Sequence, residues 1–372
     1  MKRKPEKKHR RKGRRTGCVV LRIILYVVLC LLLVLIAFAV VYRYQIVDTF
    51  RPELRRYNPF ELLGPSTKPT ILIQGDSFTA GRNSYPAIMR PRCPSYRVIN
   101  AGISGTGVIE ADLVAPRRLE RFKPSIFVYQ VYVGNDLFNI RYPINWRRLS
   151  VVRNLNWTVA QHVRSIGHLN YRVGQFLAAM QGRYQRFDTS PTTVADPLTG
   201  PMEPVDQTQF SPAHYAPLEK LYLKAEPYFL ENQIMVRRDR RDDFDLFLKT
   251  LHGLLMQCDR DVCKVYVLLI PHCCQVQRRY LENMKALGAK FSDPDEILAS
   301  EYPFMTRTRQ YLDSQRMSDV DILNPLGLLK EKEAEGQSVY YQDDSHLNAA
   351  GQRVIAEFLL DKLELGSGGS DQ

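Results

Sequence analysis

Short apolar runs separated by amphipathic stretches fill most of the chain. The apolar runs lie at residues 71–73, 97–99, 128–133, 264–270 and 320–323. Runs of this length, bounded by polar residues, Gly or Pro, are typical of buried strands. Helical spacing of apolar residues is found at residues 107–122, 151–180, 239–257, 294–316 and 349–363. Because strand and helix patterns alternate, the sequence predicts parallel βαβ units and an α/β fold.

A much longer apolar run, residues 23–42, lies near the N-terminus and contains no charged residue. A helix of this length spans about 30 Å, the thickness of a bilayer core. The preceding residues 1–17 hold ten Lys and Arg and a single acidic residue, Glu6. A positive flank of this kind predicts a single-pass anchor with a cytoplasmic N-terminus and the bulk of the chain outside the cytoplasm. The alternative is a cleaved signal peptide, with small residues at Ala37 and Ala39; its apolar region is usually only about 7–15 residues long, which favours the uncleaved anchor.

The basic head also accounts for most of the net charge of +13. Without residues 1–17 and Arg22 the chain is nearly balanced, so nothing predicts a nucleic-acid partner for the folded part. The head is expected to meet anionic lipid. Cys258 and Cys263 are spaced to close a small loop, but spacing alone leaves the disulfide pairing open.

Composition shifts divide the chain into successive segments. They predict a basic cytoplasmic head (1–17), a transmembrane helix (18–42), a juxtamembrane linker (43–66), an α/β domain (67–365) and a flexible tail (366–372). Residues 138–230 are longer than a simple crossover needs, and their Pro- and Thr-rich part is irregular. We therefore expect an insertion or lid near the site there, where specificity resides.

Polar residues follow three of the predicted strands, at the point where each strand ends. The first strand leads into Gly-Asp-Ser at 75–77, the second into Asn-Ala-Gly-Ile-Ser-Gly-Thr at 100–106, and the third into Gly-Asn-Asp at 134–136. A fourth polar stretch, residues 343–348, precedes the last predicted helix. Open α/β sheets hold their ligands at the carboxyl ends of the strands, so Ser77 is expected where a substrate binds.

These residue types suit acyl transfer, which needs a nucleophile, a base and donors for a developing oxyanion. Ser77 is the candidate nucleophile, and its own backbone N–H is one candidate donor. Among the histidines after the apolar span, only His346 lies in a loop with a carboxylate just before it and opens onto a helix. Asp343 and Asp344 both stand close enough in sequence to orient its imidazole. His272, beside two cysteines, lacks the paired Cys spacing of a zinc site.

In this order, the four polar stretches resemble the signature blocks of the SGNH (GDSL-type) hydrolases, over roughly residues 67–362. The resemblance implies a three-layer α/β/α, flavodoxin-like sandwich around a parallel sheet. It also implies that the Gly105 N–H and the Asn135 side chain complete the oxyanion hole, and its D-x-x-H pattern favours Asp343 over Asp344. The family usually shows G-x-N-D, where this chain has Val133 and Gly134 before Asn135.

The resemblance and the apolar span together predict a membrane-anchored serine esterase, acting on short-chain or acetyl esters of a cell-envelope glycan or lipid. An O-acyltransferase is the first alternative, because a sugar hydroxyl in place of water resolves the same acyl-enzyme. A non-catalytic envelope-binding protein on the same fold is the second. The G-x-S-x-G elbow of α/β-hydrolases is absent around Ser77. The chemistry requires no metal or organic cofactor, and the sequence does not indicate an oligomeric state.

Overall fold

A five-stranded sheet forms the centre of the computed structural model, which describes residues 8–141, 151–180, 195–196, 200–201, 209–237 and 240–365. In spatial order the strands are β2 (Arg97–Asn100), β1 (Thr70–Gln74), β3 (Ile126–Tyr132), β6 (Lys264–Ile270) and β7 (Asp321–Leu323). All neighbours pair in parallel. Numbered one to five by their order in the chain, these strands lie side by side in the order 2-1-3-4-5, as in flavodoxin-like sheets. The predicted α/β fold and parallel sheet are therefore confirmed.

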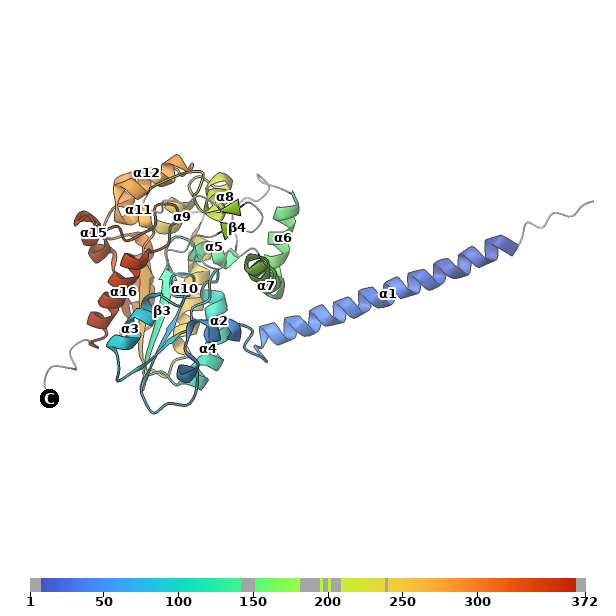
Figure 1. Ribbon diagram of the computed structural model, residues 1–372, viewed down its shortest axis with the longest axis horizontal. Coiled ribbons are helices and arrows are strands. Elements are labelled where there is room, and N and C mark those ends of the chain that lie inside the picture. Colours follow the sequence, from blue (N-terminus) through green and yellow to red (C-terminus); the bar gives the residue numbers. More distant parts are fainter. Residues whose placement is uncertain are drawn as a thin grey trace, which may run out of the picture.

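Strands β1, β2 and β3 are buried over their whole length, which explains why they are continuous apolar runs in the sequence. Helices cover both faces of such a sheet. Helix α4 (Val108–Phe122) packs against α10 (Arg241–Met256), whereas α3 (Tyr85–Met89) packs against α16 (Ala349–Lys362) (Figure 1). The chain order reverses around β1, which places the carboxyl ends of β1 and β3 at the position where such folds bind ligands.

The remaining elements are shorter or lie at the periphery. They are α5 (Asp136–Arg141), α6 (Val151–His162), α7 (Arg164–Met180), β4 (Ala195–Asp196), β5 (Gly200–Pro201), α8 (Pro217–Ala225), α9 (Phe229–Ile234), α11 (Cys273–Val276), α12 (Arg278–Ala286), α13 (Pro294–Ile297), α14 (Pro303–Ser314), α15 (Leu326–Ala334) and the 3-10 turn η2 (Arg90–Arg92). The single helix expected at 294–316 is thus two helices, α13 and α14. Pro303 begins α14, as expected for a residue that lacks an N–H and cannot continue a preceding helix.

The segment 43–66, predicted as a linker from its prolines and glycine, contains two short helices. These are α2 (Arg51–Tyr57) and the 3-10 turn η1 (Phe60–Leu63). Pro52 lies in the first turn of α2, where its missing N–H is not needed. Leu54 and Leu63 are buried in the main core, so this segment packs as part of the domain.

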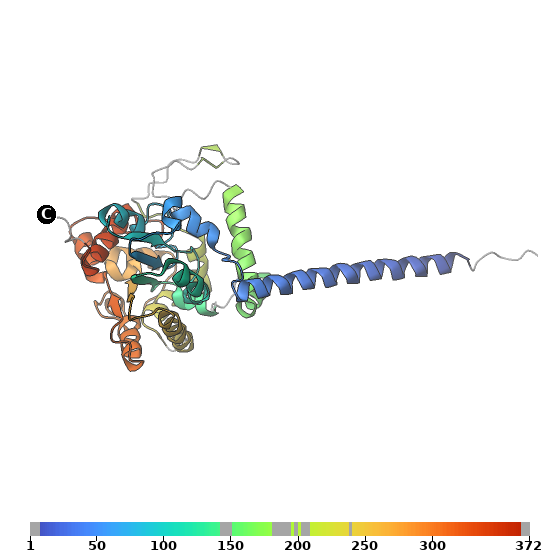
Figure 2. The same cartoon turned by 90° about the horizontal axis from the view of Figure 1, so that it is seen from below.

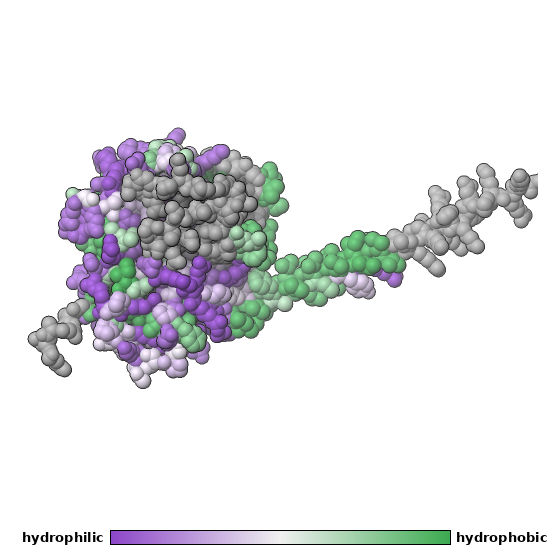
Figure 3. All heavy atoms as spheres, viewed as in Figure 1, coloured by the Kyte–Doolittle hydropathy of each residue, from purple (hydrophilic) through white to green (hydrophobic). Residues whose placement is uncertain are grey.

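Helix α1 (Lys8–Arg43) projects away from the domain in both views (Figures 1 and 2). Within it, Val19–Arg43 is long and apolar enough to cross a membrane, and no part of its most apolar stretch is buried against the protein. Figure 3 shows apolar residues along this exposed length. A helix whose exposed surface is apolar over this length is more stable in an apolar environment than in water.

Helix α7, from the long segment 138–230, packs on the C-terminal end of α1. The His168 ring contacts the rings of Tyr42 and Phe50, with centroids 5.0 and 4.7 Å away. Arg172 forms an ion pair with Glu53 of α2 at 2.5 Å. Burial, followed by the charge of Arg172, lowers the pKa of His168 to about 4, so the ring is neutral at pH 7. One part of this segment therefore lies at the C-terminal end of α1.

The cysteines of the domain, Cys258 and Cys263 among them, are free thiols. The loop disulfide left open by the sequence is not formed. The expected tail, 366–372, and most of the irregular stretch before α8 lie outside the described residues.

Candidate active site

Ser77 lies in the turn that follows β1. Asp76 shapes this turn, because its carboxylate accepts the Phe78 N–H at 2.9 Å and its carbonyl accepts the Ala80 N–H at 2.9 Å. The half-buried Ser77 hydroxyl is 2.7 Å from His346 Nε2. Two residues 269 positions apart in the chain, predicted as nucleophile and base, are therefore within hydrogen-bonding distance.

His346 is held from two sides. Asp344 Oδ1 is hydrogen-bonded to ring atom Nδ1 and also accepts the His346 backbone N–H at 3.0 Å. The Phe78 ring stacks on the imidazole, with centroids 4.7 Å apart. With Nδ1 as donor to the carboxylate, Nε2 carries the lone pair that faces the serine hydroxyl. The arrangement is Ser77–His346–Asp344.

The carboxylate that contacts Nδ1 is thus Asp344, which was the alternative to the expected Asp343. Asp344 is on Nδ1 because a carboxylate two residues before His346 closes an Asx-type turn onto that residue's N–H and so reaches its ring. Asp343 is 2% exposed, and its carbonyl accepts the N–H of Ala216 at 3.0 Å. The sequence pattern D-x-x-H did not reveal this difference, which depends on the local turn.

The surroundings of His346 favour its charged form. Burial opposes the imidazolium, but the charge and hydrogen bond of Asp344, with smaller contributions from Asp76 and Glu219, raise the pKa of His346 to about 9. The free base, which a serine nucleophile requires, is then the minor form at neutral pH. An activity that depends on this imidazole should rise with pH through this range.

The loop after β2 is joined tightly to the Ser77 turn. Asn100 Nδ2 donates to the Thr79 carbonyl at 2.8 Å, and the Ile103 N–H donates to the Gly75 carbonyl at 2.8 Å. Gly105, in the same loop, has φ +71°, a left-handed conformation that glycine adopts without strain. Among the described residues, neither the Gly105 N–H nor the Ser77 N–H donates to the protein. Within the described part of the chain, both predicted backbone donors thus have no protein acceptor.

At Gly102, in the loop after β2, there is no room for a side chain, because a Cβ would lie 2.5 Å from the Ala80 nitrogen. We expect Gly102→Ala to cost about 1–3 kcal/mol of unfolding free energy through overpacking. Gly174→Ala is the matched control: its Cβ meets open space on α7, and removing a helical glycine should stabilise by about 0.5–1 kcal/mol. Chemical denaturation of the two variants in the same detergent measures both. Equal effects of the two substitutions would contradict the close packing at Gly102.

The third predicted block follows β3 and contains Asn135, which is half-buried. Its Oδ1 atom is buried and has no hydrogen-bond partner among the described residues. The next residue, Asp136, closes the turn by accepting the Tyr132 N–H at 3.1 Å. In the predicted oxyanion role the donor would be the Nδ2 group of this amide.

If Asn135 acts in this way, Asn135→Ala should lower kcat by about 10²–10³-fold, with a much smaller change in KM, because the contact strengthens in the transition state. Asn232→Ala on α9, whose amide donates to Glu226, is the control at a distance and should leave kcat unchanged. Steady-state hydrolysis of a chromogenic ester measures both variants. A loss confined to KM would assign Asn135 to ground-state binding instead.

Gln130 connects the turns after β1 and β3, a role the sequence analysis missed. Its buried Oε1 atom accepts the Asp76 N–H at 3.1 Å and the Thr79 hydroxyl at 2.9 Å. A Cβ on Gly75 would lie 2.3 Å from the same atom. The only available signal was a polar residue within the apolar run of β3, which is unusual for a strand buried on both faces.

Two buried carboxyl groups, those of Asp76 and Asp136, lie directly beside the predicted site residues Ser77 and Asn135 in the chain. Burial raises the pKa of Asp76 to about 6, against the Phe78 N–H and His346, which lower it. Burial also raises the pKa of Asp136 well above its usual range, and the charge of Asp76 adds to this. Perturbed carboxyls of this kind concentrate at functional sites, although structural networks produce them as well.

Part of the long segment 138–230 also borders the site. The N–H of Ala216, just before α8, donates to the Asp343 carbonyl. Glu219 of α8 has its Oε1 atom 3.2 Å from His272 Nε2. His272 in turn caps α11 by accepting the Cys274 N–H. Within the described residues, no group of three or more His, Cys, Asp or Glu side chains is arranged to hold a metal ion.

Comparisons with known proteins add little to this geometry. No protein-family model matches the chain, and no curated protein sequence matches it. Among solved structures, a catalytic mutant of the acetylxylan esterase Axe2 from Geobacillus stearothermophilus is similar over 83% of this chain and 99% of its own, with 11% identity and a TM-score of 0.38. A likeness at this level carries no argument about fold or function.

Proposed function

We propose that this protein is a membrane-anchored serine esterase. The observation that carries the proposal is the 2.7 Å contact of the Ser77 hydroxyl with His346 Nε2, together with the Asp344 carboxylate on the other ring nitrogen. A serine, an imidazole and a carboxylate in this sequence of contacts form an activated nucleophile. A binding protein does not need them joined in this way.

In the proposed reaction, Ser77 Oγ attacks the acyl carbon while His346 Nε2 takes the hydroxyl proton. Asp344 stays ionised and stabilises the imidazolium. The N–H groups of Ser77 and Gly105 and the Asn135 amide are the proposed donors to the oxyanion. When the tetrahedral intermediate collapses, the imidazolium gives its proton to the leaving alcohol. Water then attacks the acyl-enzyme by the same steps and releases the acid.

The substrate class we propose is a short-chain O-ester, such as an acetyl group, on a component of the cell envelope. The test is hydrolysis of p-nitrophenyl esters of increasing chain length by the full chain in detergent, followed by acetylated glycans. An acyl-enzyme that is resolved by a sugar instead of water makes the protein an O-acyltransferase. Mass spectrometry of an added glycan acceptor distinguishes transfer from release of free acid. No turnover and no acyl-enzyme with any of these esters would contradict both enzymatic functions.

The anchor part of the proposal predicts that the mature protein keeps its N-terminal helix. Intact-mass measurement of protein purified from membranes should include residues 1–42, since this apolar stretch is longer than that of a signal peptide. Protease added outside the cytoplasmic membrane should digest the domain and spare an epitope on the basic head. A mass that begins after Ala39 would instead show cleavage, and digestion of the head would reverse the orientation.

A further inference from the structure

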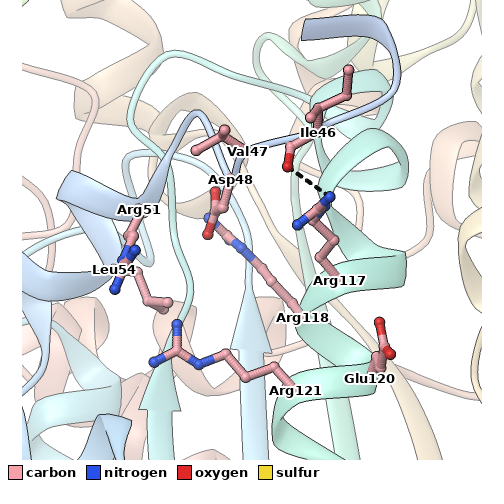
Figure 4. A pocket seen from close by; sticks show the side chains of 9 residues that line it. All are labelled: Ile46, Val47, Asp48, Arg51, Leu54, Arg117, Arg118, Glu120 and Arg121. Atoms are coloured by element: carbon pink, nitrogen blue, oxygen red, sulfur yellow. Dashed lines mark hydrogen bonds between the residues drawn. The ribbon is translucent and has the colours of Figure 1, made fainter. Parts of the chain in front are cut away.

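A pocket lined by basic side chains lies between the segment that follows α1 and helix α4. Its volume is about 560 Å³. Ile46 and Val47 line it on one side, and Arg117, Arg118 and Arg121 of α4 line it on the other (Figure 4). The predicted catalytic residues do not line this pocket.

Arg118 is the unusual member of this pocket, because its charged side chain is only 1% exposed. One guanidinium nitrogen, Nη1, donates to the Ala101 carbonyl at 2.6 Å. The other two, Nε and Nη2, are buried without a hydrogen-bond partner among the described residues. A buried guanidinium with open donors is costly, and burial accordingly lowers the pKa of Arg118. An anion that accepts from Nε and Nη2 would remove this cost.

The residues that line the pocket carry a net positive charge, although the charges of Asp48 and Glu53 partly offset the effect of burial on the pKa of Arg118. Arg51 of α2 joins the arginines of α4, and these four outnumber the two carboxylates of the pocket, Asp48 and Glu120. Asp48 already accepts the Phe50 N–H at 2.9 Å. Figure 4 shows Arg118 extending from α4 toward Asp48, between Arg117 and Arg121. The pocket therefore keeps an excess of guanidinium groups after its own carboxylates are counted.

The position of the pocket narrows the class of anion. Ile46 and Val47 follow the apolar helix, which ends at Arg43, by only a few residues. If that helix crosses a bilayer, the pocket lies near the level of the phosphates of the lipid headgroups. Several guanidinium forks that approach from different elements suit the oxygens of a phosphate group. The volume exceeds that of a small ion and is within the usual range for ligand sites.

We propose that this pocket binds a phosphate-bearing anion, with Arg118 as its buried anchor and Arg51 as a second contact from α2. The phosphate belongs either to an anionic lipid headgroup or to a free phosphate compound. This proposal depends on the pocket and not on the hydrolase chemistry, so catalysis and phosphate binding succeed or fail separately.

The test measures the melting temperature of the full chain, first in detergent and then in lipid nanodiscs. In nonionic detergent, inorganic phosphate should raise the melting temperature above that in chloride of equal ionic strength, because a ligand of the native state stabilises it. Nanodiscs of phosphatidylglycerol are then compared with nanodiscs of phosphatidylcholine. If the phosphatidylglycerol discs stabilise the chain and added phosphate has no further effect, the ligand is the lipid. If added phosphate stabilises it equally in both discs, the ligand is a free phosphate compound.

Variants show whether the pocket is responsible. Arg51→Gln should raise the half-saturating phosphate concentration by about 10-fold, the loss of one charge-assisted contact. Arg55→Gln is the matched control, because this exposed residue is on the same helix one turn further and does not line the pocket. Arg118→Met should abolish the rise in melting temperature with phosphate. If this variant has a different melting temperature without phosphate, equilibrium dialysis with radiolabelled phosphate measures its binding directly. Equal behaviour of Arg51→Gln and Arg55→Gln would overturn the proposal. So would the absence of a phosphate effect in detergent together with equal melting temperatures in the two kinds of nanodisc.

Discussion

Replacing Ser77 by alanine is expected to lower ester hydrolysis by about 10⁴–10⁶-fold, because the nucleophile is removed while the other side chains remain. The contact of Ser77 Oγ with His346 Nε2 is the basis for an effect of this size. Hydrolysis of p-nitrophenyl acetate by wild type and variant measures it. The variant should still fold, because the Ser77 side chain is only half-buried and its hydroxyl is hydrogen-bonded to another residue of the site, His346.

The control for this variant is Ser104→Ala. Ser104 is a half-buried serine in the neighbouring loop, directly before Gly105. Its replacement should leave the rate within about twofold, the usual size of effect away from reacting atoms. A fluorophosphonate probe gives an independent readout, since peptide mapping should find the adduct on Ser77 alone. Label on another serine, or hydrolysis that survives Ser77→Ala, would remove Ser77 from the mechanism.

Asp344→Asn is expected to lower kcat by about 10⁴-fold, since an amide neither fixes the required tautomer nor stabilises the imidazolium. It should also change the pH dependence. In the wild type, kcat/KM should rise with pH up to about 9, because the base form of His346 appears only as the pH passes the raised pKa. Without the Asp344 charge, which raises that pKa, the ascending limb should move to lower pH, toward the usual value of about 6.5.

Asp343→Asn is the matched comparison, because it makes the same chemical change one residue earlier. If Asp344 is the orienting carboxylate, Asp343→Asn should leave the position of the pH limb unchanged, whatever this buried substitution does to folding stability. Pre-steady-state and pH-rate measurements on both variants decide between the two aspartates. A limb that moves in Asp343→Asn and stays in Asp344→Asn would restore the assignment implied by the D-x-x-H pattern.

Several parts of the fold followed from local sequence alone. The strand Lys264–Ile270 and the helix Val108–Phe122 lie where the apolar patterns predicted them, within a residue. Both are long, strongly patterned segments for which burial and local preference agree. The segment 43–66 was misjudged because proline signals either a loop or the first turn of a helix. Only the burial of Leu54 against the core distinguishes these two cases.

The sequence by itself determined the parallel α/β pattern, the apolar N-terminal helix and the residue types of the candidate site, because each depends on neighbouring positions. Tertiary structure alone decided that Ser77 meets His346, that Asp344 faces the ring, and that Arg118 is buried with open donors. These contacts join positions far apart in the chain, or depend on the exact turn of a loop. The physical reason is that sheet order and side-chain direction are set by packing across the whole domain, which no local pattern encodes.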